Sequence, residues 1–102
     1  MRALLIVRAV VPEADRAAFD AWYRAEHLPD AMRAFGVARA FRAWNRTTPE
    51  IHVAAYEFPS VAAARAVQGT AAIEALIAEF DRVWQGRVSR TREVFEVVDE
   101  RA

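Results

Sequence analysis

Two neighbouring titratable side chains, Glu26 and His27, stand in the stretch AWYRAEHLPD at residues 21–30. They continue a helical spacing of i, i+3, i+4, i+7 and i+8 that begins with Phe19, Trp22 and Tyr23, and residues at this spacing share one face of a helix. A charge buried on such a face without a partner is strongly unfavourable. Glu26 and His27 are therefore expected either to stay hydrated at the mouth of a cleft or to have partners.

The imidazole of His27 is a candidate proton carrier. Leu28 precedes Pro29, which disfavours the helical conformation, so the helix is expected to kink or stop near His27. A helix C-terminus favours the protonated ring, whereas burial favours the neutral ring, and together they predict a pKa near neutrality. Such a pKa suits a general acid or base. The alternative is a structural His27 that caps the helix through a backbone carbonyl.

The residues around His27 also have two interpretations each. Glu26 is expected to pair with an arginine, Arg42 or Arg39. Trp22 is expected in the core or in the wall of a cleft. Tyr23 either donates a hydrogen bond to a substrate oxygen or packs with its hydroxyl at the edge of the core.

Side chains on two predicted strands supply further candidates. Arg42 and Trp44 alternate with small residues on one strand, and Tyr56 shares a face with His52 on the next. Small residues beside aromatic and polar ones leave space that a ligand can fill. Arg42 is a candidate for holding a carboxylate or an enolate, with an ion-paired or solvated strand arginine as the alternative.

The other polar strand residues are expected to lie outside the site. His52, near a strand start, is predicted at the surface or in an interface. The alternating arginines of the last strand are predicted to form a solvated edge; they are Arg87, Arg90 and Arg92.

The elements that must position these residues follow from periodicity and from turn residues. Strands are expected at residues 2–11, 37–46, 50–58 and 88–98. One helical region starts at Pro12 and ends at Gly36; a second starts at the N-cap Ser60, breaks at Gly69 and restarts at Thr70. This β-α-β-β-α-β order predicts an α+β, ferredoxin-like domain over residues 1–102, with two helices on one face of a four-stranded antiparallel sheet.

Composition narrows the function. The chain has 102 residues, 55% of them hydrophobic, with 14 basic and 14 acidic residues and no cysteine. The charge balance argues against nucleic-acid and membrane-surface partners, and the lack of cysteine excludes thiolate chemistry. The apolar N-terminal run is too short to span a bilayer and is interpreted as a strand, so a cytoplasmic location is expected. The apolar excess favours burial of a surface against a second copy.

Cofactor sites are not predicted. The two histidines lack a metal-binding spacing, so no metal site is expected. Three glycines and no glycine-rich loop argue against a nucleotide. RNA-recognition domains share the element order, but their aromatic strand signature is absent.

The motif W-Y-x-x-E-H-L-P-D, followed by a glycine and an arginine-rich strand, resembles the dimeric α/β-barrel superfamily and, within it, the EthD-like branch. The matching residues are Trp22, Tyr23, Glu26, His27, Leu28, Pro29, Gly36 and Arg42. The resemblance implies a homodimer whose sheets pack face to face and a cleft between helices and sheet in each subunit. Members include cofactor-free monooxygenases, lactone isomerases, polyketide cyclases and haem-degrading enzymes, so the fold alone does not select a reaction, and haem ligation stays open.

Two hypotheses follow. In the first, the protein is a cofactor-independent isomerase, cyclase or monooxygenase that acts on a small aromatic or polyketide-like acid or lactone. His27 then moves a proton, Tyr23 and Arg42 hold an oxyanion, and the substrate-binding residues are Trp22, Trp44, Tyr56 and Asp30. In the second, it is a non-catalytic homodimer that binds a small organic ligand or acts as an accessory protein.

Overall fold

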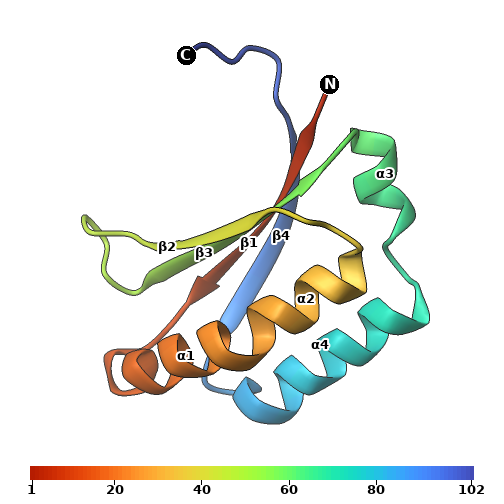
Figure 1. The fold of residues 1–102 in the computed structure, drawn as a ribbon. Coiled ribbons are helices and arrows are strands. Elements are labelled where there is room, and N and C mark those ends of the chain that lie inside the picture. Colours follow the sequence, from red (N-terminus) through yellow and green to blue (C-terminus); the bar gives the residue numbers. More distant parts are fainter.

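The computed structural model describes all 102 residues and has two layers, a sheet and a helical layer (Figure 1). The strands are β1 (Ala3–Val10), β2 (Ala40–Trp44), β3 (Ile51–Phe58) and β4 (Ser89–Glu96). The helical segments are η1 (Glu13–Asp15), α1 (Arg16–Trp22), η2 (Tyr23–His27), α2 (Leu28–Phe35), α3 (Val61–Ala66) and α4 (Ala71–Trp84). The predicted α+β, ferredoxin-like class is confirmed.

The four strands form one antiparallel sheet in the order β2-β3-β1-β4. Opposed residues point to the same face, so the register fixes which side chains meet the helices. Val7 stands between Ala54 of β3 and Arg92 of β4, and Ala54 in turn faces Arg42 of β2. All four side chains therefore project toward the helical layer.

The first helical region runs from η1 to the end of α2 without a break. Of the two outcomes expected near His27, a kink or a stop, the stop is wrong, and the helix is irregular there instead. Leu28 is helical, with φ −62° and ψ −48°, although it precedes a proline. The turn at Tyr23–His27 is a π-helix, in which the Leu28 amide donates to the Tyr23 carbonyl five residues back. This wider turn accommodates Pro29, which has no amide hydrogen to donate to the carbonyl four residues earlier.

The capping residues lie where the sequence predicts them. Gly36 ends α2 with a left-handed φ of +68°. The Ser60 hydroxyl accepts the Ala63 amide at the start of α3, and the Thr70 hydroxyl accepts the Ile73 amide at the start of α4. These caps fix the return of the chain along the sheet. None of the helices has the length and apolar composition needed to span a bilayer.

The core fills the space between the two layers. Alternate residues of β1 and β3 meet the inner faces of the helices there. Its largest fully buried apolar and aromatic side chains are Leu5, Val11, Phe19, Tyr23, Tyr56, Ile73 and Phe80. The other face of the sheet carries no helix.

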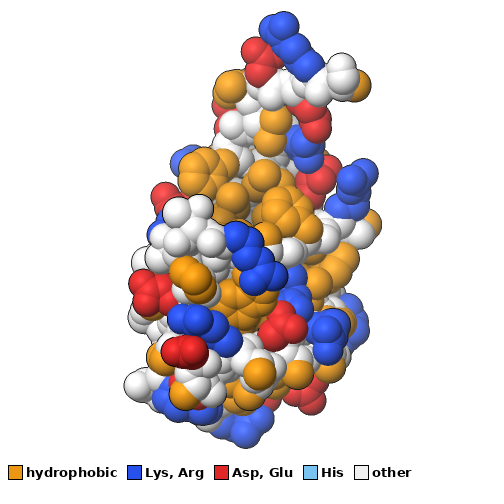
Figure 2. Space-filling model, turned by 90° about the vertical axis from the view of Figure 1, so that its left-hand side faces the viewer, with side chains coloured by type: hydrophobic (Ala, Val, Ile, Leu, Met, Phe, Trp, Pro, Cys, Tyr) orange, Lys and Arg blue, Asp and Glu red, His pale blue; other side chains and the backbone are white.

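Large apolar side chains remain exposed on that outer face. Phe41 of β2 is 55% exposed and Phe95 of β4 is 47% exposed. Leu4 and Ile6 of β1 lie between them and are half-buried. Figure 2 shows hydrophobic side chains gathered on one side of the molecule below the C-terminal tail, with charged side chains around them.

Candidate functional site

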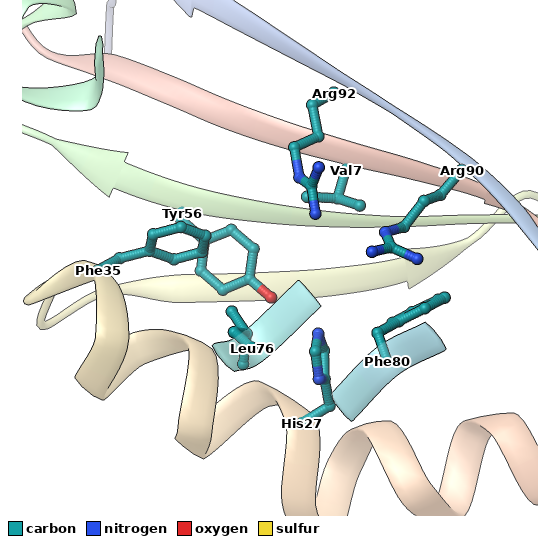
Figure 3. Close-up of a pocket in the computed structure, with 8 residues that line it drawn as sticks. All are labelled: Val7, His27, Phe35, Tyr56, Leu76, Phe80, Arg90 and Arg92. Atoms are coloured by element: carbon teal, nitrogen blue, oxygen red, sulfur yellow. The ribbon is translucent and has the colours of Figure 1, made fainter. Parts of the chain in front are cut away.

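A small cavity lies between the helical layer and the sheet, with His27 on its helical side. Its lining comes from η2, α2, α4 and three strands (Figure 3). The lining residues are Val7, His27, Phe35, Tyr56, Leu76, Phe80, Arg90 and Arg92. The volume open to the centre of a water molecule is about 10 Å³, which is room for about one water. A ligand larger than that enters only if side chains at the mouth move.

The π-turn is what carries His27 into this cavity. In a regular α-helix, the side chain of residue i+8 points roughly 80° away from the side chain of residue i. The wider turn takes up this rotation, so Phe19, Tyr23 and His27 are all buried. Glu26 is exposed instead and forms no ion pair, so its predicted place on the apolar face and its predicted arginine partner are both wrong.

The imidazole of His27 is buried among aromatic rings. It stacks on Trp22 at 4.6 Å between centroids and meets Tyr23 and Phe80 edge-on. Its Nδ1 is buried without a hydrogen-bond partner, so His27 is not a backbone cap. Burial, together with the positive charges of Arg90 and Arg92, lowers the pKa of His27 to about 4.

The neutral form of His27 therefore prevails at pH 7, which corrects the expected near-neutral pKa. The expectation relied on a helix C-terminus at His27. The helix continues to Phe35, so the end of the helix dipole is eight residues away and burial dominates.

Two tyrosine hydroxyls meet at the wall of the cavity. The Tyr23 and Tyr56 oxygens are 2.9 Å apart, and both side chains are buried. One hydrogen bond joins them and uses only one of the two protons. Since Tyr56 lines the cavity and Tyr23 does not, Tyr56 is the hydroxyl that is placed to donate into the cavity. Burial raises the pKa of Tyr23 to about 12 and that of Tyr56 further, so both stay protonated at neutral pH.

Arg90 and Arg92 enter the cavity from β4, opposite His27 (Figure 3). Arg90 lies over the Phe80 ring at 3.8 Å and forms a 3.0 Å ion pair with Asp81. The prediction of a solvated arginine edge is wrong for Arg90, whose side chain is only 12% exposed. Arg92 is more exposed along its length, but its guanidinium group turns into the cavity and has no carboxylate partner.

A second polar cluster lies further along the sheet. It contains Arg42 and Trp44, which the sequence predicted in the site. Asp20 accepts hydrogen bonds from Trp44 Nε1 and from Arg42 Nη2, each at 2.8 Å. Arg42 Nη1 lies 3.2 Å from His52 Nε2. A guanidinium group only donates, so His52 Nε2 accepts this bond and the ring proton is on Nδ1. None of these four side chains lines the cavity of His27.

His52 is 1% exposed, so its predicted surface position is wrong. Its ring lies against Phe19, Tyr23 and Trp44. Burial and the charge of Arg42 lower the pKa of His52 to about 4. Arg42 is ion-paired, which is one of the two alternatives that the sequence left open. The pKa of Asp20 is lowered below its usual value, first by the hydrogen bond from Trp44 and then by the contacts with Arg42.

The remaining predicted site residues do not line the cavity. Trp22 forms the back of the site through its stack on His27. Asp30 forms an ion pair with Arg33 on α2 and borders an outer groove with Glu26 and Glu79. The structure therefore brings His27, Tyr23, Trp22 and Tyr56 together and leaves Trp44 and Asp30 elsewhere. Arg42 lies outside the cavity, although its guanidinium group stands 5.9 Å from the centroid of the Tyr23 ring.

The cavity beside His27 has no metal-binding cluster and little free space. No three histidine, aspartate or glutamate side chains converge in a way that holds a metal ion. A porphyrin is far larger than the cavity beside His27. The groups available for chemistry are a neutral imidazole, a phenol and two guanidinium groups.

Comparison with known proteins places the fold. No protein-family model matches the sequence, and no curated protein matches it either. An EthD-family protein from Bacillus halodurans has the same fold, with a TM-score of 0.74 and 16% identity over 96% of this chain and 100% of that one.

Two similar structures carry names that refer to oxygenase activity. SnoaB, a cofactor-independent oxygenase from Streptomyces nogalater, was solved as the N63A mutant and aligns with a TM-score of 0.68 and 15% identity, over 97% of this chain and 95% of that one. A candidate antibiotic biosynthesis monooxygenase from Nitrosomonas europaea aligns with a TM-score of 0.65 and 20% identity, over 95% and 90%. The expected resemblance is thus confirmed at the level of fold, which this chain shares with EthD-family and antibiotic biosynthesis monooxygenase structures.

Proposed function

We propose that the protein is a small cofactor-independent oxygenase that acts on an aromatic or polyketide-like acid or lactone in the cavity beside His27. The observation that carries the proposal is the set of groups around this one cavity. A neutral imidazole with an unpartnered nitrogen faces a phenol and two guanidinium groups. The names of SnoaB and of the Nitrosomonas protein support an oxygenase over an isomerase or a cyclase.

The chemistry needs a proton acceptor and a place for negative charge. The neutral imidazole of His27 accepts a proton from an activated CH₂ group of the substrate, which leaves an enolate. Tyr56 and Arg92 hold the enolate oxygen, because charge-assisted hydrogen bonds to an oxyanion are strong in a partly dry site. The carbanion carbon reduces O₂, forms a C–O bond and gives a hydroperoxide, which loses water. The sum is CH₂ + O₂ → C=O + H₂O, and it is balanced without an external reductant.

The other predicted roles change with this arrangement. Tyr23 acts through Tyr56 as a positioning residue, since its hydroxyl contacts Tyr56 and not the cavity. The oxyanion role expected for Arg42 passes to Arg92, because Asp20 holds the Arg42 guanidinium group outside the cavity. Arg42 and Trp44 then stabilise the sheet against α1.

The active form in this proposal is a homodimer whose sheets pack face to face. The exposed Phe41 and Phe95 on a sheet face without helices support it, since such a face is rarely left in water. The similar solved structures support the dimer only in that they have the same fold.

Oxygen uptake tests the proposed function directly. An anthrone or a hydroxynaphthoate, as a representative polyketide-like substrate, is mixed with protein treated with a chelator, and dissolved oxygen is followed with an electrode. We expect His27→Ala to lower the rate by about 10²–10⁴-fold, the usual contribution of a positioned proton acceptor. His52→Gln is the matched control, because it replaces the other buried histidine, and it is expected to keep most of the rate.

The second candidate, a non-catalytic ligand-binding homodimer, is favoured by one observation. With a pKa of about 4, the ring of His27 is a weak base. Binding of the same compounds without oxygen uptake, and with equal affinity in wild type and His27→Ala, would support this candidate and exclude the oxygenase.

A further inference from the structure

The charges around the cavity are not balanced. Arg90 and Arg92 bring two positive charges to its sheet side, and Asp81 pairs only with Arg90. Burial and the nearby Arg90 lower the pKa of Arg92, which still leaves its guanidinium group charged at neutral pH. His27 and Tyr56 are neutral there. One uncompensated positive charge therefore faces the cavity.

Arg90 also closes part of the cavity wall. It lies over the Phe80 ring and is held by Asp81, a half-buried residue one position further along α4. Ion pairs with partly exposed partners contribute little to stability, so this contact can be exchanged. An anionic group that enters beside Arg92 meets the guanidinium group of Arg90 as well.

We propose that the cavity binds its ligand as an organic anion, through a carboxylate whose oxygen is held by Arg92 and replaces Asp81 on Arg90. This inference rests on the cavity being the ligand site of the proposed function, and it adds the charge state of the ligand. Exchange of Asp81 for the ligand moves the Arg90 side chain and enlarges a space that otherwise holds about one water.

Binding of an anion also changes His27. The charged groups that act on His27 are Arg90 and Arg92 from β4 and Glu79 from α4, and the neutral His52 lies on β3. After burial, the two arginines are the main causes of the low pKa of His27. An anion that neutralises them raises this pKa, so His27 becomes a better proton acceptor when the ligand is bound. Binding is then accompanied by uptake of a fraction of a proton.

The test compares two probes of the same shape, 2-naphthoate and 2-naphthamide, by titration calorimetry on the full-length protein. We expect the carboxylate to bind about 10- to 100-fold more tightly than the amide, the ratio typical of a hydrogen bond to a charged group. Repeating the titration at pH 5.5 in two buffers with different heats of ionisation measures the proton uptake, which is expected for the carboxylate only.

Variants assign the effect to the arginines. Arg92→Gln is expected to remove the preference for the carboxylate, whereas Arg65→Gln, an exposed arginine on α3, is expected to keep it. Asp81→Asn removes the competing carboxylate and is expected to tighten binding of naphthoate severalfold, with Asp99→Asn in the C-terminal tail as the control.

Equal affinity for the two probes, a preference that survives Arg92→Gln, or no binding of naphthoate at millimolar concentration would each overturn the inference. The experiments distinguish failure of this inference from failure of the proposed function. Anion-selective binding without oxygen uptake leaves the inference standing and removes the oxygenase. Oxygen uptake with uncharged substrates and no preference for anions removes the inference and leaves the oxygenase standing.

Discussion

At the residue scale, the molecule places two neutral histidines in its interior and surrounds each with different partners. His27 stacks on Trp22 and keeps Nδ1 unpartnered beside a cavity. His52 accepts a hydrogen bond from Arg42, which is anchored by Asp20. Both rings keep Nδ1 buried without a partner, but only the His27 ring lines the cavity, and the Nε2 lone pair of His52 is committed to Arg42. This difference separates the candidate active residue from a structural one.

Both histidines make folding stability depend on pH. In each, burial lowers the pKa from 6.5 to about 4 in the folded state, so the unfolded chain binds protons first as the pH falls. Stability is complete above pH 6.5 and is lost between 6.5 and about 4, by up to about 1.4 kcal/mol per pH unit for each histidine.

Urea unfolding at pH 7 and pH 5 measures this loss. The range ends above the ordinary pKa values of the carboxylates, so Asp20 contributes little to the change. His52→Gln is expected to show about half of the wild-type loss. A free energy of unfolding that is the same at pH 7 and pH 5 would show that the rings are not buried in neutral form.

The sequence identified His27 and Tyr56 because helical spacing and strand parity put them beside apolar residues. It did not identify Arg90 and Arg92. In SRTREVFE both strand faces mix polar and apolar residues, so parity alone does not tell which face meets the helices. The pairing of Arg92 with Val7 decides this, and pairing between distant strands is not visible in a local pattern.

At the element scale, one irregular turn determines the site. The π-turn at Tyr23–His27 keeps the helix continuous through Pro29 and directs His27 inward. The caps at Gly36, Ser60 and Thr70 were predictable, because each needs a particular side chain or a positive φ. The π-turn was not predictable, because residues before proline usually leave the helical conformation, whereas Leu28 keeps it.

The end of α2 offers a test of this positioning. Gly36 has φ +68°, and a Cβ atom there would meet no atom within 4 Å, so Gly36→Ala costs only backbone strain. We expect it to lower the free energy of unfolding by about 1 kcal/mol. Gly36→Asn is the matched variant and should recover part of the loss, since asparagine tolerates the left-handed region. Equal stability of the alanine variant and wild type would contradict the described end of the helix.

At the scale of the whole molecule, the sheet has one face covered by helices and one face with large exposed apolar side chains. A chain of 102 residues with 55% hydrophobic composition has more apolar residues than this modest core takes up. The antiparallel sheet and the ferredoxin-like class followed from the order of predicted elements. The use of the outer face depends on a partner, and the proposed partner is a second copy.

Sedimentation tests this proposal with one substitution on the outer face. Phe41→Glu places a charge on an exposed β2 side chain, and we expect it to give a monomer at concentrations where the wild type is a dimer. Val98→Glu is the control, because Val98 is 72% exposed in the C-terminal tail. A wild-type protein that sediments as a monomer, or a Phe41→Glu protein that remains dimeric, would rule out the sheet-to-sheet dimer.

The most direct test of the central claim is oxygen uptake by chelator-treated wild type and His27→Ala on the same polyketide-like substrate. The proposed function predicts one O₂ consumed per ketone formed by the wild type, and a rate for His27→Ala that is lower by at least about 100-fold while His52→Gln stays active. A His27→Ala protein that consumes oxygen at the wild-type rate would contradict it.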